Sequence, residues 1–176
     1  GYTQKDTVIL FLSGGMGMTA IEKMLPSVVH KHPQWKLIAI VGNNKKREEA
    51  LARLQLKQLT VVGWTEHIEE YMALSDVIVT KAGGITTTEC MALNRSMLLV
   101  SPIPGQEEAN AQLVERVGAG TLFRGKHENV VFAIEKSVKK NQSQMKNKEF
   151  SHLQIAKKDA ARRILESVLS YLSSSS

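Results

Sequence analysis

The segment Val77–Glu89 constrains this chain more than any other. It joins an apolar, β-branched run, Val77–Thr80, through a glycine pair, Gly83 and Gly84, to a threonine-rich stretch. This pattern indicates a short buried strand that opens through glycines onto the start of a helix. The first turn of a helix presents unpaired backbone N–H groups and the positive end of the helix dipole. The segment therefore predicts a site for an anionic group.

A second glycine loop, Ser13-Gly-Gly-Met-Gly17, follows another strand-like run, Val8–Leu12. Such a turn alone is weak evidence, because ordinary strand-to-helix turns also contain glycine. It lacks the Gly-Lys-Ser/Thr of a P-loop, which argues against ATP or GTP hydrolysis. The next predicted strand ends in Val41-Gly-Asn-Asn44 without the acidic residue expected of an NAD site. Two glycine loops after strands favour a ligand with phosphates at one end and hydroxyls elsewhere, which a nucleotide-sugar fits.

Short β-rich runs alternate with helical patterns along the whole chain. This rhythm predicts an α/β fold with a doubly wound (Rossmann-like) parallel sheet of about six strands. The predicted strands are Thr7–Leu12, Lys36–Val41, Leu59–Val62, Asp76–Thr80, Met97–Ser101 and Gly120–Phe123. The predicted helices are Thr19–Lys31, Lys45–Leu54, Glu66–Leu74, Thr86–Leu93, Glu107–Val117, Glu128–Lys140 and Leu153–Leu172. Sheets of this class bind ligands beyond the carboxyl ends of their strands.

We expect one domain, residues 1–140, followed by a linker and a C-terminal helix of the same domain over 141–172. The polar stretch Asn141–Lys148 is the predicted linker, and residues 173–176 read as a disordered serine tail. A hydrophobic content of 43% is typical of a soluble globular protein, and no apolar run reaches the ~20 residues that span a bilayer. A start at Gly1-Tyr2 rather than Met indicates a piece of a longer protein.

The single cysteine, Cys90, excludes an internal disulfide and fits a reducing, cytoplasmic setting. It lies in an apolar helical stretch with no His close in sequence. A buried structural thiol is therefore favoured over a nucleophile.

The net charge of +6 is concentrated late in the chain, where residues 136–163 hold nine Lys or Arg against two acidic residues. Two interpretations stay open, a solvated face and a surface that binds an anionic membrane. Nucleic acid is disfavoured, because aromatic residues are not interleaved with these cations.

Glu89 lies one turn into the helix that begins after the glycine pair. A carboxylate at that place can accept hydrogen bonds from both hydroxyls of a ribose whose phosphates sit at the helix start. The alternative is a glutamate that only stabilises the helix through its dipole.

A third loop, Pro102–Asn110, is expected at the same edge of the sheet. Its Gln106, Glu107 and Asn110 offer donors and acceptors suited to sugar hydroxyls. The alternative is an ordinary turn in which the acidic residues are helix-start charges.

The stretch Gly63-Trp-Thr-Glu-His67 follows the third predicted strand and could form a wall of a base pocket. A tryptophan at such a place more often packs simply in the core or at its rim, and this alternative stays open for Trp64. His67 is interpreted as a surface residue at a helix start. No His, Cys and Asp grouping has zinc spacing and no Ser-His-Asp arrangement is visible, so we predict no metal site and no catalytic triad.

Taken together, these loops resemble glycosyltransferase family 28, whose members are inverting nucleotide-sugar glycosyltransferases with two Rossmann-like domains (the GT-B type). The likeness is to the C-terminal, donor-binding domain and runs from about Val8 to Arg124. It is most specific in Val61–Trp64, Ser75–Glu89 and Pro104–Asn110. Within the family it looks closest to the glycolipid branch of monogalactosyldiacylglycerol synthases and processive diacylglycerol glucosyltransferases.

The resemblance implies a role for each motif residue. It assigns the donor diphosphate to Gly14, Gly15, Met16 and Gly17 and to Gly83, Gly84, Ile85 and Thr86, the ribose to Glu89, the uracil to Trp64, Thr65 and Ile68, and the transferred sugar to Gln106, Glu107 and Asn110. The peptidoglycan branch usually has a small polar residue at Met16, so only a backbone contact is expected there. No cofactor or obligatory metal is implied, and the catalytic base and acceptor site belong to an N-terminal domain that this chain does not contain.

The expected function is that of the UDP-sugar-binding domain of an inverting glycosyltransferase that transfers a hexose to a lipid acceptor such as diacylglycerol. The domain alone is expected to be inactive. A non-catalytic UDP-sugar sensor and half of a UDP-sugar epimerase are the alternatives, and the Pro104–Glu107 loop favours a transferase over the epimerase. The expected partners are a UDP-sugar, the lipid acceptor through the other domain and an anionic membrane surface, at the cytoplasmic face of the membrane.

Overall fold

The computed structural model describes residues 2–3, 5–12, 21–125, 129–147 and 159–174. Its centre is one six-stranded sheet with the order β3-β2-β1-β4-β5-β6, in which each neighbouring pair of strands is parallel. The strands are β1 (Val8–Leu12), β2 (Lys36–Ile40), β3 (Leu59–Val62), β4 (Val77–Thr80), β5 (Ser96–Val100) and β6 (Gly120–Phe123). The predicted doubly wound parallel sheet is confirmed, and the strand order reverses between β1 and β4.

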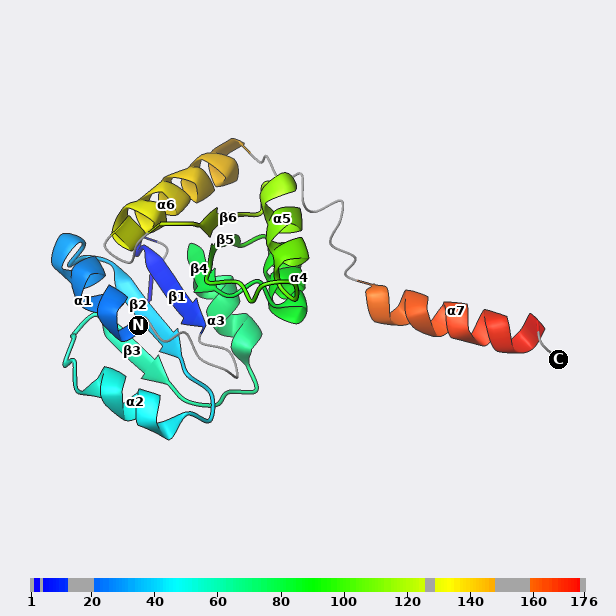
Figure 1. Ribbon diagram of the computed structural model, residues 1–176, viewed down its shortest axis with the longest axis horizontal. Helices are drawn as coiled ribbons and strands as arrows, with labels where there is room; N and C mark the ends of the chain where they lie inside the picture. The colour runs from blue at the N-terminus through cyan, green and yellow to red at the C-terminus, as the bar shows by residue number, and fades with distance from the viewer. Residues whose placement is uncertain (1, 4, 13–20, 126–128, 148–158, 175–176) are drawn as a thin grey trace.

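Helices cover both faces of this sheet (Figure 1). The covering helices are α1 (Ile21–Lys31), α2 (Lys45–Ala52), α3 (Ile68–Leu74), α4 (Gly84–Ala92), α5 (Glu108–Arg116) and α6 (Val130–Asn147), and a further helix, α7 (Ala160–Ser174), follows them in the chain. Side chains of α1, α2 and α6 pack on one face, against Ile9 and Phe11 of β1, and side chains of α3, α4 and α5 pack on the other, against Val8 and Leu10. Burial on both faces explains why the central strands are almost wholly apolar.

Helix α6 corrects one prediction from the sequence. The linker expected over Asn141–Lys148 is helical as far as Asn147. Asn141 is only 3% exposed and continues the buried stripe of α6, and the amide of Gln144 donates to the carbonyl of Gly118 at 3.3 Å. The segment forms the end of α6 despite its polar composition, because its contacts with the rest of the domain outweigh the local preference of polar residues for a loop.

Helix α7 stands apart from the sheet and its covering helices (Figure 1). It includes residues 173 and 174, so the prediction of a disordered tail is wrong for these two residues. Residues 175–176 and the predicted helical residues 153–158 lie outside the described part. The apolar side chains of Ile164, Leu165, Val168 and Leu169 are each at least half exposed. No helix among the described residues is both long and apolar enough to cross a membrane.

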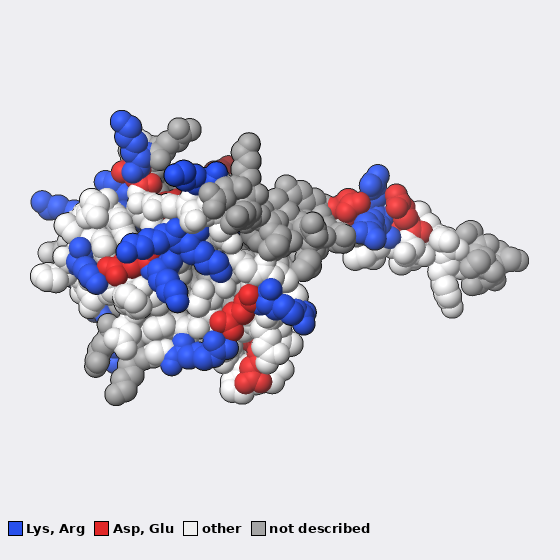
Figure 2. Space-filling view, turned by 90° about the horizontal axis from the view of Figure 1, so that it is seen from above, with Lys and Arg blue, Asp and Glu red and all other residues white. Residues whose placement is uncertain are grey.

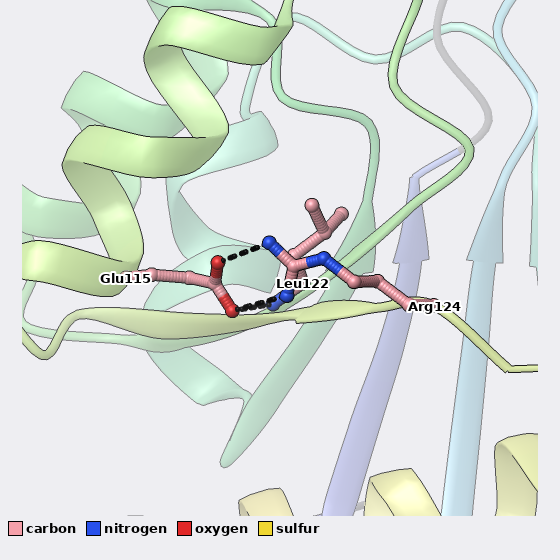
Figure 3. Close-up of polar contacts among 3 residues, drawn as sticks. All are labelled: Glu115, Leu122 and Arg124. Atoms are coloured by element: carbon pink, nitrogen blue, oxygen red, sulfur yellow. Dashed lines mark hydrogen bonds and ion pairs between the residues drawn. The ribbon is translucent and has the colours of Figure 1, made fainter.

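Hydrogen bonds from one glutamate link α5 to the edge strand β6 and to the residues just after it (Figure 3). The Glu115 carboxylate accepts hydrogen bonds from the Leu122 N–H at 3.0 Å and from both terminal nitrogens of Arg124, at 3.1 and 2.8 Å. The hydrogen bonds from the Arg124 guanidinium stabilise the ionised carboxylate of Glu115. They therefore lower its pKa below the ordinary value of 4.5.

The Glu115–Arg124 pair should make the free energy of unfolding depend on pH in the acid range. A carboxyl group whose pKa is lower in the folded state contributes its full stabilisation when the pH is above its ordinary pKa. This contribution disappears as the pH falls through the lowered pKa. We expect Glu115→Gln to flatten the acid limb of a urea-unfolding series measured against pH, and Arg124→Gln to flatten it likewise. An acid limb that is unchanged in both variants would contradict this role of the pair.

Candidate functional site

The carboxyl ends of the parallel strands form one edge of the sheet. The segments after β2, β3, β4 and β5 leave from this edge and lead into α2, α3, α4 and α5. The reversal of strand order between β1 and β4 places a crevice there, because the chain runs away from this point in both directions. The described residues therefore place three of the four motif regions, the third, fourth and fifth strand ends, along one edge.

A cavity of about 750 Å³ opens at this edge, within the size range of small-molecule sites. Its floor comes from strand ends and its walls come from the starts of three helices. The described lining residues are Leu12, Ile40, Val41, Gly42, Asn43, Asn44, Lys45, Lys46, Trp64, Thr65, Ile68, Thr80 and Thr86. An apolar floor with polar and aromatic walls suits a ligand that has a flat ring and polar edges.

The three residues predicted for a base pocket meet in this cavity. Trp64, Thr65 and Ile68 all line it, although they belong to a loop and a helix start. Trp64 is 69% exposed, so it lies at the rim and is not part of the core. The Thr65 hydroxyl accepts the His67 N–H at 3.1 Å, which turns the chain into α3 and leaves His67 on the surface.

The wall made by Asn43–Lys46 was not assigned to the site from the sequence. Gly42 has a φ of +60°, so the chain turns sharply after β2 and carries the next residues over the cavity. The Asn44 side chain caps α2 by accepting the Arg47 N–H at 3.1 Å, and Lys45 pairs with Glu48 at 3.0 Å. The signal in the sequence that could have identified this wall is a glycine followed by two amides and two lysines at a strand end.

The strand β4 leads through the glycine pair into the start of α4, as the sequence predicts. Gly83 is the N-cap and α4 begins at Gly84, and no atom of the described residues lies within 4 Å of the position a Cβ would take on Gly83. The hydroxyls of Thr87 and Thr88 donate back to the carbonyls of Gly83 and Gly84, at 2.9 and 2.8 Å. These bonds stiffen the first turn, whose leading N–H groups have no partner within the helix.

Glu89 is half-buried on the second turn of α4. Within the described part of the chain, its carboxylate makes no hydrogen bond and no ion pair. It therefore has its acceptors available for hydroxyl donors, as a ribose ligand requires.

The three residues predicted for the sugar differ in what they contact. Gln106 is exposed, and its side chain has no polar partner among the described residues. Glu107 is 9% exposed and accepts the Ile103 N–H at 2.8 Å, whereas the Asn110 amide donates to the Ala82 carbonyl at 2.9 Å. Two of the three residues thus hold neighbouring loops together, and neither lines the cavity.

Known proteins with this sequence pattern and geometry identify the family. The chain matches the glycosyltransferase family 28 C-terminal domain over residues 8–164, most of its length. The chain belongs to this family.

One relative and two solved structures illustrate the likeness. The processive diacylglycerol beta-glucosyltransferase of Bacillus pumilus (strain SAFR-032) is 29% identical over 175 residues, which cover 96% of this chain and 44% of that protein. Acinetobacter baumannii MurG superposes with a TM-score of 0.74 at 19% identity, over 96% of this chain and 51% of that one. A UDP-GlcNAc 2-epimerase from Neisseria meningitidis, bound to UDP-GlcNAc, superposes with a TM-score of 0.66 at 17% identity, over 96% and 45%. The two structures share the fold, and this chain spans less than half of the relative.

Two further predictions concern this family 28 domain. The glycine loop with Gly14, Gly15, Met16 and Gly17 lies outside the described residues. Cys90 is buried, and burial raises the pKa of its thiol to about 12, so the thiol is protonated at neutral pH and is no nucleophile. The prediction of a buried structural thiol is confirmed.

Among the described residues of the family 28 domain, one group has the spacing of metal ligands. The ligand atoms of His67, Glu69 and Glu70 lie within 4.8 Å of one another, and all three residues are exposed. Nothing buried or preorganised holds them, so the group carries no assignment.

The two tryptophans of the domain should respond differently to truncation. Trp35 is 7% exposed and stacks on His32 at 3.8 Å, whereas Trp64 projects from the cavity rim. We expect Trp35→Ala to lower the free energy of unfolding by about 3–5 kcal/mol. Trp64→Ala should change it by no more than about 0.5 kcal/mol. Urea unfolding followed by circular dichroism measures both, and a large loss in Trp64→Ala would place that side chain in the core.

Proposed function

We propose that this chain is the UDP-sugar-binding domain of an inverting glycosyltransferase that transfers a hexose to a lipid acceptor such as diacylglycerol. One observation carries the proposal: the cavity at the strand reversal holds Trp64, Thr65 and Ile68 beside the open first turn of α4. A flat base, a ribose and a diphosphate in sequence would find a matching partner at each step. The name of the Bacillus pumilus relative, a diacylglycerol glucosyltransferase, supports the acceptor class.

In this proposal each region of the edge meets one part of the donor. The uracil packs against Trp64 beside Thr65 and Ile68, and Glu89 accepts hydrogen bonds from the ribose hydroxyls. The α4 turn at Gly83–Thr86, together with the loop at Gly14–Gly17, donates N–H groups to the diphosphate. Gln106 faces the transferred hexose.

Transfer would proceed by direct attack of an acceptor hydroxyl on the anomeric carbon, with inversion. The bond to the UDP oxygen breaks as the new glycosidic bond forms, and the proton of the hydroxyl goes to a base outside this chain. Negative charge then develops on the departing diphosphate, where fixed N–H dipoles at helix starts stabilise it. This stabilisation needs no metal ion, and we propose none.

Two alternatives use the same fold without glycosyl transfer to lipid. A sensor would bind UDP-sugar and return it unchanged, and an epimerase would invert a centre of the bound sugar. Full-length protein incubated with UDP-glucose and diacylglycerol should yield glycolipid and UDP. Recovery of an epimerised nucleotide-sugar, or of unchanged donor only, would favour the alternatives.

Removing Glu89 should weaken nucleotide binding by this domain. We expect Glu89→Ala to lower the affinity for UDP by about 1–3 kcal/mol, the usual worth of hydrogen bonds to a charged group. Glu166→Ala, which removes an exposed carboxylate on α7, is the matched control and should leave the affinity unchanged. Titration calorimetry with UDP measures both, and equal affinities for wild type and Glu89→Ala would remove Glu89 from the ribose site.

We also propose that the basic surface of α6 attracts an anionic membrane, which would bring the enzyme to its acceptor at the cytoplasmic face. Lys136, Lys139 and Lys146 are exposed on α6, and Figure 2 shows lysine and arginine side chains outnumbering acidic ones over that side of the domain. Each well-placed cation contributes about 1 kcal/mol to such binding. The attraction should weaken with salt, since screening acts over about 8 Å at physiological ionic strength.

Liposome sedimentation tests this surface. The double variant Lys136→Glu and Lys139→Glu should bind anionic vesicles more weakly than wild type, whereas Lys5→Glu with Lys57→Glu carries the same charge change away from α6 and should bind as wild type. Equal loss in both double variants, or no wild-type binding, would leave α6 as a solvated face.

A further inference from the structure

The loop between β5 and α5 is held in an unusual backbone conformation. Ser101 has a φ of +46° and Gly105 a φ of +74°, both in the left-handed region. A non-glycine residue such as Ser101 stays there only when its surroundings hold it. This loop carries Gln106, so whatever holds the backbone also decides where that side chain points.

Glu107 supplies the principal hold on this loop. Its carboxylate accepts the Ile103 N–H at 2.8 Å, and its own N–H donates to the Ile103 carbonyl at 2.9 Å. Glu107 is only 9% exposed, which is unusual for a glutamate. The hydrogen bond to its carboxylate offsets part of the free-energy cost of burying it. Its neighbour Glu108 is exposed and accepts the Gly105 N–H at a longer 3.2 Å.

Asn110 ties the same segment to the start of α4. Its side-chain nitrogen donates to the Ala82 carbonyl at 2.9 Å and lies 3.7 Å from where a Cβ would stand on Gly84. The loop that carries Gln106 and the turn that faces the diphosphate are therefore fastened to each other through one amide. A shift of the loop would therefore displace the start of α4, and a shift of the start of α4 would displace the loop.

We propose that Glu107 is a positioning residue, which acts on the donor sugar by holding the 101–106 loop so that Gln106 faces the hexose, with Asn110 fixing this loop to the α4 turn. The inference rests on the proposed function and departs from the expectation that Glu107 itself contacts the sugar. The inward hydrogen bond and the burial of Glu107, against the exposure of Gln106, separate the two roles.

A conservative and a truncating variant distinguish the roles. Glu107→Gln keeps an oxygen that accepts the Ile103 N–H, so positioning predicts wild-type affinity for UDP-glucose. Glu107→Ala removes the acceptor and should weaken UDP-glucose binding about tenfold, the equivalent of one hydrogen bond to a charged group. UDP, which has no sugar to place, should bind all three proteins equally. Glu166→Ala, which removes an exposed carboxylate on α7 with no hydrogen bond to this loop, is the control and should behave as wild type towards both ligands.

Amide hydrogen exchange of the free domain reports the hold directly. The Ile103 N–H should exchange about tenfold faster in Glu107→Ala than in wild type or Glu107→Gln. The amides of the buried strand β5 should exchange equally in all of them, which separates a loosened loop from general unfolding.

The outcomes decide the proposal and the function separately. Equal losses of UDP-glucose affinity in Glu107→Gln and Glu107→Ala would make Glu107 a direct charged ligand and overturn positioning, as would unchanged exchange at Ile103. A wild-type domain that binds UDP-glucose, UDP-galactose and UDP-N-acetylglucosamine no more tightly than UDP would overturn the sugar role of the loop. A wild-type domain without affinity for UDP would overturn the proposed function itself, whatever the exchange at Ile103.

Discussion

The pairing of β1 with β4 is the constraint on which the rest of the structure depends. Ile9, Leu10 and Phe11 lie opposite Val77, Ile78 and Val79, and all six side chains are fully buried. These two strands, which three helices and two other strands separate in sequence, become neighbours, and the chain must then continue outward on both sides. A crevice at their carboxyl ends follows from this topology alone. The loops only decide what the crevice binds.

The loops on the two sides of the reversal have different physical characters. Towards β2 and β3 they surround a cavity with exposed side chains, of which Trp64 is the largest. Towards β5 they are tied down by short hydrogen bonds, through Glu107 to Ile103 and through Asn110 to Ala82. The first side can adapt to a ring by rotating side chains, whereas the second holds a fixed shape. Precise placement of a reacting sugar calls for the second kind of support.

Features governed by local chemistry were predictable from the sequence. The apolar run Val77–Thr80 and the glycines after it are sufficient to predict β4 and the start of α4, because burial and the N-cap demand those residue types. Asn141 is the opposite case: its polar side chain favours a linker, and its burial on α6 depends on packing against the rest of the domain, which the sequence does not display. Glu107 is the same problem in the site: its position in the motif was clear, but whether a glutamate faces outward or back into its own loop depends on three-dimensional contacts.

The basic cluster of residues 136–163 was treated as one feature in the sequence, and the structure divides it in two. On α6 the exposed lysines cover a helix whose other side is packed into the domain. On α7, Arg162 lies 3.3 Å from Asp159 and 3.9 Å from Glu166, so much of its charge is locally balanced (Figure 2). What distinguishes α7 is instead the exposed apolar side chains of Ile164, Leu165, Val168 and Leu169. Electrostatic binding to an anionic surface, which salt weakens, is therefore expected of α6. Any association through α7 would instead be driven by burial of its apolar side chains and would persist at high salt.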